Sequence, residues 1–159
     1  MNYSIIGAGR QGIASAYDIG KFGDAENIKL FDLDINAASQ GAKRLNKLLS
    51  KNLFTAHQID VTNFDQLKKM LSDTDAVLAG IPYKYLPKLT EIAIECGTPM
   101  VDYGGNTDNA IRQIELSDLA KEKGITIVPE CGMGPGMNIT LALLAMEQMD
   151  TPEEVSIWD

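Results

Sequence analysis

The sequence predicts an α/β fold: a doubly wound parallel sheet in a three-layer α/β/α arrangement. Three observations predict it. Strand-length apolar runs alternate with helical patterns along the whole chain. The first run leads directly into a glycine-rich turn that holds Gly7, Gly9 and Gly12. A second run ends on an acidic residue, Asp32, about 20 residues after that turn.

The first half of the chain supplies three strands and three helices. Strands are expected at residues 3–6, 28–31 and 54–59, where short apolar runs end in turn residues. A helix is expected at 11–20, before the turn at Gly23 and Asp24. A second is expected at 35–50, where Ala38, Leu45, Leu48 and Leu49 recur at helical spacing. Asn63 is a typical N-cap for a short helix that ends near residue 71.

The second half repeats the alternation. The run at 75–79 is typical of a buried parallel strand, and 99–102 and 125–128 follow as the fifth and sixth strands. Helices are expected at 86–96 and 108–123, which end at Gly97 and Gly124, and an apolar helix at 138–149. Six strands joined by helical crossovers, with the glycine motif after the first, predict the strand order 3-2-1-4-5-6.

The glycine turn indicates a dinucleotide site of the Rossmann fold. Gly7 permits the tight turn out of the strand, and Gly9 lets a pyrophosphate approach the backbone. Gly12 lets the helix pack closely, and the helix that begins near Arg10 directs free N–H groups at the phosphates. Gly-x-Gly-x-x-Gly alone is a weak signal, but strand, turn, helix and acid all occur here in the right order.

Asp32 favours NAD over NADP. Its carboxylate is expected to accept hydrogen bonds from the ribose hydroxyls and to repel a 2′-phosphate. The residues that follow it, 33–35, include no cation, and Lys43 and Arg44 lie further along the next helix. Arg10 is the one cation in the glycine loop, and it leaves NADP open as the less favoured cofactor.

Four segments are expected at the carboxyl ends of the strands, where ligands bind in such sheets. Asp60 and Val61 follow the third strand and could frame the adenine, although Asp60 fits a helix cap equally well. Residues 80–85, 102–106 and 129–136 follow the last three strands, and a plain turn is the alternative for 102–106. The residues expected to bind the cofactor are Gly7, Gly9, Arg10, Gln11, Gly12, Asp32, Asp60, Val61, Gly80 and Pro82.

Composition excludes other classes of function. A net charge of −8 over 159 residues with no basic patch argues against binding to nucleic acid or to an anionic membrane surface. No apolar run reaches the length of a membrane span. Cys96 and Cys131 have neither metal-site nor disulfide-framework spacing, so no metal site is predicted and a cytoplasmic location is expected.

The sequence resembles the N-terminal nucleotide-binding domain of the saccharopine dehydrogenase family, and within it the lysine 6-dehydrogenase branch. The matching stretches are Gly-Ala-Gly-Arg-Gln-Gly at 7–12, Pro-Tyr at 82–83, Val-Asp-Tyr-Gly-Gly-Asn-Thr-Asp at 101–108 and Gly-Ile-Thr-Ile-Val-Pro-Glu-Cys-Gly-Met-Gly-Pro-Gly at 124–136. Saccharopine reductases usually carry Asp at the position of Gly134, so this glycine favours the lysine branch.

The resemblance implies an NAD-dependent oxidoreductase that oxidises a C–N bond of an amino-acid substrate by hydride transfer. It also implies that residues 1–150 are the cofactor domain. Residues 151–159 would then be the first strand of a further domain, which binds the substrate and forms the homodimer. The chain by itself is then expected to bind NAD without turnover. The tentative catalytic residues are Asp102, with Asn106 and Glu130 as polar support.

Other candidates rank lower. Tyr83 and Lys84 are alternative acid–base groups, whereas His57 is expected to be structural and Cys131 to be an inert packing residue. Two other functions stay open at this point. One is a non-catalytic NAD-sensing domain of the kind that regulates potassium transport. The other is a reductase of the same family that acts on another amine, such as a polyamine synthase.

Overall fold

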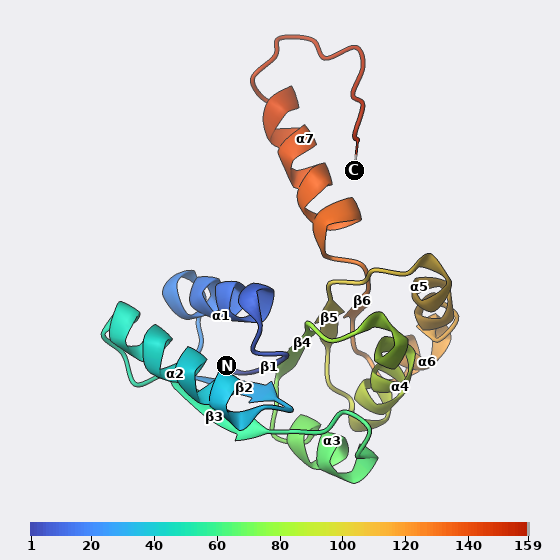
Figure 1. Ribbon diagram of the computed structural model, residues 1–159. Coiled ribbons are helices and arrows are strands. Elements are labelled where there is room, and N and C mark those ends of the chain that lie inside the picture. Colours follow the sequence, from blue (N-terminus) through green and yellow to red (C-terminus); the bar gives the residue numbers. More distant parts are fainter. Residues whose placement is uncertain (159) are drawn as a thin grey trace.

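The computed structural model, which describes residues 1–158, contains one sheet of six parallel strands in the order β3-β2-β1-β4-β5-β6 (Figure 1). This order confirms the prediction. The strands are β1 (Asn2–Ile6), β2 (Asn27–Asp32), β3 (Phe54–Gln58), β4 (Ala76–Ala79), β5 (Met100–Asp102) and β6 (Ile127–Val128). The order reverses between β1 and β4, so a crevice is expected at their carboxyl ends.

Helices cover both faces of the sheet, which confirms the three-layer arrangement. α1 (Arg10–Phe22) and α2 (Ile35–Leu49) cover one face over β1, β2 and β3 (Figure 1). The opposite face carries α3 (Phe64–Leu71), α4 (Leu86–Cys96), α5 (Thr107–Ile114) and α6 (Ser117–Glu122). Neighbouring side chains of one strand enter different cores: Ile5 packs with the α1–α2 layer, and Ile6 packs with α3 and α4.

Polar caps start the helices that follow the functional strand ends. Asp34 accepts a hydrogen bond from the Asn36 amide at the start of α2, and Asn63 accepts one from the Gln66 amide at the start of α3. Asn106 caps α5 in the same way through the Asn109 amide. These caps satisfy amide groups that have no partner inside the helix, so they fix where each strand-end loop stops.

The prediction of a single helix at 108–123 is wrong, because the chain forms α5 and α6 with a break at Leu116. Leu116 leaves the helical conformation (φ −86°, ψ 6°) and its amide bonds to the Gln113 carbonyl. The break lets each helix turn its own small or polar side chain inward. α5 buries Ala110 and Gln113, and α6 buries Ala120.

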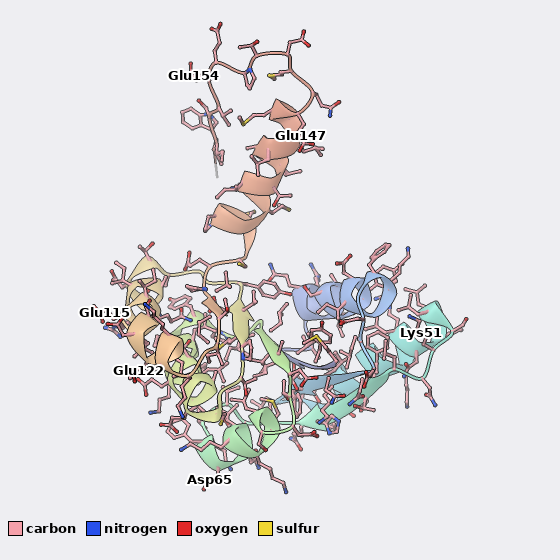
Figure 2. All side chains as sticks on the ribbon, turned by 180° about the vertical axis from the view of Figure 1, so that it is seen from behind. Lys51, Asp65, Glu115, Glu122, Glu147 and Glu154 are labelled. Atoms are coloured by element: carbon pink, nitrogen blue, oxygen red, sulfur yellow. The ribbon has the colours of Figure 1, made fainter. Side chains whose placement is uncertain are left out.

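The apolar helix expected at 138–149 forms as α7 (Asn138–Met146), but it does not join the core. It follows the π-helical turn η2 (Met133–Met137) and projects from the body, and none of its residues is buried (Figures 1 and 2). The strand expected at 154–159 is absent from residues 154–158, and Asp159 lies outside the described residues. Within residues 1–158, no helix has the length and apolar character needed to cross a bilayer.

Candidate functional site

The glycine loop joins the end of β1 to the first turn of α1. Gly7 has a positive φ of 100°, and a Cβ there would overlap the carbonyl group of Gly80. A Cβ at Gly12 would overlap the carbonyl oxygen of Gly7. A Cβ at Gly9, in contrast, would meet no atom within 4 Å. Gly7 and Gly12 are therefore needed by the fold, whereas the space at Gly9 is free for a ligand, as a pyrophosphate requires.

Asp32, the last residue of β2, is tied to the glycine loop. Its Oδ2 accepts a hydrogen bond from the Ala8 amide at 2.8 Å, and its Oδ1 accepts one from the Asp34 amide at 3.0 Å. These bonds fix the carboxylate beside the loop and leave each oxygen with acceptor capacity for a ribose hydroxyl. Leu33 and Asp34, which follow it, are exposed and place no cation there.

A crevice of about 320 Å³ lies at the point where the strand order reverses. It brings together six of the predicted cofactor residues: Gly7, Asp32, Asp60, Val61, Gly80 and Pro82. Its other lining residues were not among the predicted cofactor residues, although Ile81 and Tyr85 fall in the predicted segment 80–85: they are Ile6, Leu33, Ile59, Thr62, Ile81 and Tyr85. These are the chain neighbours of the predicted residues, and the signal that could have found them is their position at the same strand ends.

Asp60 stabilises the turn at the rim of this crevice. Its Oδ1 accepts hydrogen bonds from the Thr62 hydroxyl at 2.7 Å and the Thr62 amide at 2.8 Å. The bond from the Thr62 side chain, followed by that from its amide, lowers the pKa of the Asp60 carboxyl. The N-cap of α3 is Asn63, so Asp60 shapes the loop before the helix without capping it.

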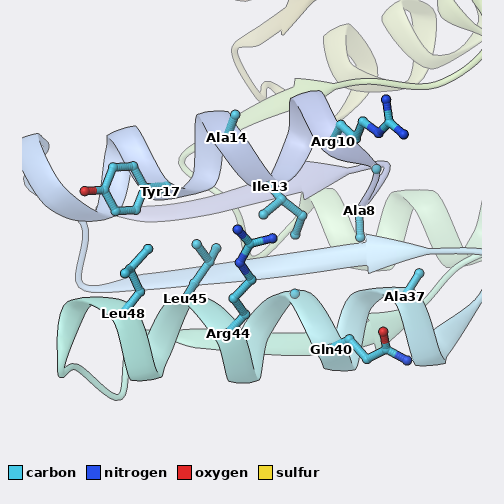
Figure 3. A pocket seen from close by; sticks show the side chains of 12 residues that line it. Ala8, Arg10, Ile13, Ala14, Tyr17, Ala37, Gln40, Arg44, Leu45 and Leu48 are labelled. Atoms are coloured by element: carbon cyan, nitrogen blue, oxygen red, sulfur yellow. The ribbon is translucent and has the colours of Figure 1, made fainter.

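Arg10 and Gly9 border a different and larger groove, of about 640 Å³, between α1 and α2 (Figure 3). Its walls are mostly apolar, with Ile13 on α1 and Leu45 on α2, and the Arg44 side chain extends toward α1. Figure 3 shows Arg10 at the first turn of α1, directed away from α2. The groove meets the glycine loop at one end only and lacks the strand-end carboxylates, so the smaller crevice is the candidate nucleotide site.

Asp102 is completely buried at the end of β5. Its Oδ1 accepts hydrogen bonds from the amides of Gly104 (2.7 Å) and Glu130 (3.1 Å). Its Oδ2 accepts one from Gln113 Nε2 at 2.7 Å. The carboxylate is thus surrounded by protein donors and ties two strand-end loops together, an arrangement that suits a structural anchor.

Glu130 and Asn106 lie together where the loop after β6 meets the loop after β5. Glu130 Oε1 accepts hydrogen bonds from the Gly105 amide (3.1 Å) and the Asn106 amide (3.2 Å). The side-chain oxygen of Asn106 accepts the hydrogen bond that caps α5. The structure therefore brings the three predicted catalytic residues into one connected group at the ends of β5 and β6.

Tyr103 belongs to the predicted strand-end segment 102–106, but it was not among the candidate site residues. Its hydroxyl lies 2.5 Å from Ser15 Oγ on α1, and its ring packs where a Cβ at Gly80 would lie. Burial raises the pKa of this phenol. The sequence signal that could have found it is an aromatic residue directly after a strand-end Asp.

The lower-ranked candidates occupy different surroundings. Tyr83 lies next to the first turn of α5, where its carbonyl accepts a hydrogen bond from Asn109 Nδ2, whereas the Lys84 ammonium lies over the Tyr85 ring. His57 stacks on Phe31, and burial, followed by the charge of Lys29, lowers its pKa. Burial raises the pKa of the Cys131 thiol, which does not favour a reactive thiolate. Across residues 1–158, no group of three His, Cys, Asp or Glu side chains is placed to hold a metal ion.

Among curated proteins, the chain is similar to saccharopine dehydrogenase and to alpha-aminoadipic semialdehyde synthase. Saccharopine dehydrogenase [NADP(+), L-glutamate-forming] from Saccharomyces cerevisiae is 28% identical over 118 residues, which are 74% of this chain and 26% of that protein. Mouse mitochondrial alpha-aminoadipic semialdehyde synthase is 27% identical over 127 residues, 78% of this chain and 13% of that protein. The chain thus spans about a quarter or less of the length of these relatives.

Solved structures share the fold. Apo saccharopine dehydrogenase (L-Glu forming) from Saccharomyces cerevisiae superposes with a TM-score of 0.66 at 24% identity, covering 92% of this chain and 31% of that one. GenD2 from gentamicin A biosynthesis, in complex with NAD, gives a TM-score of 0.65 at 18% identity, covering 93% and 38%.

Residues 4–128 match the family described as the saccharopine dehydrogenase NADP binding domain. The matched family, the yeast relative and its solved structure are all named for saccharopine dehydrogenase, so the hypothesis of a potassium-transport regulator is set aside. With its glycine loop, its Asp32 and its crevice at the strand reversal, the chain belongs to the saccharopine dehydrogenase family as an NAD(P)-binding domain.

Proposed function

We propose that this chain is the NAD-binding part of an oxidoreductase that oxidises a C–N bond of an amino-acid substrate. The observation that carries the proposal is the crevice at the β1–β4 reversal, which is lined by Gly7 of the glycine loop and by Asp32, bound to that loop through the Ala8 amide. The names of the relatives, saccharopine dehydrogenase and alpha-aminoadipic semialdehyde synthase, support a substrate with a secondary or primary amine.

The residues fit a dinucleotide. Gly9 leaves open space above the first turn of α1, where free amide groups and the helix dipole favour phosphate. Asp32 is fixed where it can accept both ribose hydroxyls. The same carboxylate opposes a 2′-phosphate, so we assign NAD and not the NADP named for the family and the yeast relative.

The bound nicotinamide would supply the hydride acceptor, and the protein would supply position and polarity. Residues at the ends of β5 and β6, with Glu130 and Asn106 foremost, form the polar wall on that side. Gly134 favours the lysine branch of the family, so a free amino acid with a side-chain amine is the proposed substrate. A homodimer, on the resemblance to the family, and a cytoplasmic location, on the spacing of Cys96 and Cys131, complete the proposal.

The test is an absorbance assay for NADH formation by the protein encoded in the complete reading frame. L-lysine and saccharopine are offered separately, each with NAD and with NADP. The proposal predicts NADH formation with L-lysine and little or none with saccharopine. Turnover of neither amine with either cofactor, by a protein that binds NAD, would reject amine oxidation.

A further inference from the structure

Glu130 is held in an unusual backbone conformation next to the loop that follows β5. Its φ is 61°, a left-handed value that a non-glycine residue adopts only where the surrounding structure holds it. The carboxyl group lies against Gly104, where a Cβ would come within 2.6 Å of its Cδ. The side chain and the glycine turn are therefore fitted to each other.

Asp102 supplies the anchor that keeps Glu130 in this place. It accepts the Glu130 amide directly, and its backbone carbonyl accepts the Cys131 amide at 2.8 Å. Gln113, itself 4% exposed, bonds to the other carboxylate oxygen and to Thr90 Oγ1 at 2.8 Å. Both sides of the Glu130 backbone are thus tied to one buried residue, which makes its orientation a property of the β5–β6 core.

The two carboxylate oxygens of Glu130 differ. Oε1 accepts the Gly105 and Asn106 amides, whereas Oε2 accepts no hydrogen bond from residues 1–158. The buried side-chain nitrogen and oxygen atoms of residues 1–158 that lack a partner include only Asn138 Nδ2, so Glu130 Oε2 is open to solvent. The side chain therefore presents one fixed, unoccupied acceptor.

This acceptor lies on the side of the sheet toward which a bound dinucleotide extends. The crevice holds Asp32 at the end of β2, so the adenosine half belongs on that side and the pyrophosphate belongs at Gly9. The rest of the molecule must then cross β1 and β4 toward β5 and β6. Pro82 ends the crevice on that side, and the next residue, Tyr83, lies within 3.6 Å of where a Cβ at Gly105 would stand.

We infer that Glu130 recognises the carboxamide of the nicotinamide by accepting its N–H through Oε2, and that Asp102 is the positioning residue that holds Glu130 there. The inference rests on the proposed function, because it needs NAD in the crevice. It also gives Asp102 and Glu130 separate roles. Glu130 contacts the cofactor, and Asp102 acts only through Glu130.

Three ligands test the contact: NAD, ADP-ribose, which lacks the nicotinamide, and nicotinic acid adenine dinucleotide, which carries a carboxylate in place of the carboxamide. Isothermal titration of the 159-residue chain should give tighter binding of NAD than of the nicotinic acid form, because two carboxylates repel each other. Glu130→Gln should reduce this preference about tenfold or more, since an amide can donate to the ligand's carboxylate. ADP-ribose affinity should stay the same.

Asp102→Asn tests the positioning role. This variant keeps the Glu130 carboxylate, but it places a side-chain N–H group against the N–H donors that bond to Asp102 in the wild type. The preference for NAD should therefore fall as in Glu130→Gln, while ADP-ribose binding persists. Glu115→Gln, which changes an exposed carboxylate directly after α5, is the matched control and should keep the wild-type preference.

Each remaining outcome counts against a definite statement. An unchanged preference in Glu130→Gln overturns the contact, and an unchanged preference in Asp102→Asn overturns the positioning role. A wild-type chain that binds neither NAD nor ADP-ribose rejects the proposed function, and this inference with it. Binding of ADP-ribose together with equal affinity for NAD and its nicotinic acid analogue rejects only this inference.

Discussion

The two halves of the sheet build their strand-end loops in different ways. On the β1–β3 side, the glycine loop and Asp32 are joined by a bond between Ala8 and Asp32, which are 24 residues apart within one βαβ unit. On the β4–β6 side, Asp102 and Glu130 are joined across the α5–α6 crossover. Gln113 holds the Asp102 carboxylate, and Gly104 and Gly105 form the turn beside Glu130. The first half uses a compact recurrent motif, whereas the second half uses a buried network in which Asp102 joins Gln113 to the Glu130 backbone. A sequence can therefore reveal the first half more fully than the second.

Replacing Gly9 tests the motif half with the largest expected effect. Gly9→Val should abolish NAD binding, because the added side chain fills the space that the phosphates need. Loss of two charge-assisted hydrogen bonds would already cost about 3–6 kcal/mol, or at least ~100-fold in affinity. Isothermal titration measures the loss, and circular dichroism should show an unchanged fold.

Gly12→Ala is the matched variant, because a Cβ there collides with the backbone of Gly7. It should lower the thermal midpoint, which Gly9→Val should not. If both variants lower the thermal midpoint equally, then Gly9 is needed for the fold as much as Gly12, and the assignment of Gly9 to ligand binding alone is wrong.

Replacing Asp32 probes the same half at one charge. Asp32→Ala should weaken NAD binding by about 1.5–3 kcal/mol, since a charged hydrogen bond to the ribose is lost. It should weaken NADP binding less, because the repulsion of the 2′-phosphate disappears together with the hydrogen bond. Titration of each nucleotide into both proteins measures the two changes, and equal losses for NAD and NADP would show that Asp32 does not discriminate between them.

Replacing Asp102 tests whether the hydrogen-bond network on the β4–β6 side stabilises the fold. Asp102→Asn should lower the free energy of unfolding by about 1–3 kcal/mol, because one of its three protein donors would face another donor in a fully buried place. Chemical denaturation measures the change. Asp18→Asn, on the exposed side of α1, is the control and should stay within about 0.5 kcal/mol of the wild type. A change no larger than that of the control would mean that the network does not stabilise the fold.

His57 gives the smallest expected effect and concerns pH. Burial, followed by the charge of Lys29, lowers its pKa from the ordinary value of 6.5, so the unfolded chain takes up a proton that the folded chain resists. Stability should therefore fall as the pH drops below about 6.5 and stop falling below the folded-state pKa. Denaturation of the wild type and of His57→Gln at several pH values between 5 and 8 isolates the effect, which the variant should lack. A variant with the same pH dependence would assign it to other groups.

The parts that the sequence predicted follow from local chemistry. The strand order, the glycine loop and Asp32 depend on residue types at fixed spacing, and the structure places them as expected in relation to one another. The break at Leu116 could not be predicted, because it depends on which side of each short helix meets the sheet. The same is true of Asp102: a carboxylate at a strand end has the same sequence signal whether it faces a ligand or three protein donors. α7 was predicted as a helix from its composition, but composition does not reveal what that helix packs against.

Asp32 and the glycine loop are expected to bind NAD at the β1–β4 reversal in preference to NADP. Side-by-side isothermal titration of NAD and NADP into the wild-type chain tests it most directly. Saturable binding at one site is expected, with NAD bound about tenfold or more tightly than NADP, because Asp32 repels the 2′-phosphate. Tighter binding of NADP, or no binding of either nucleotide, would contradict it.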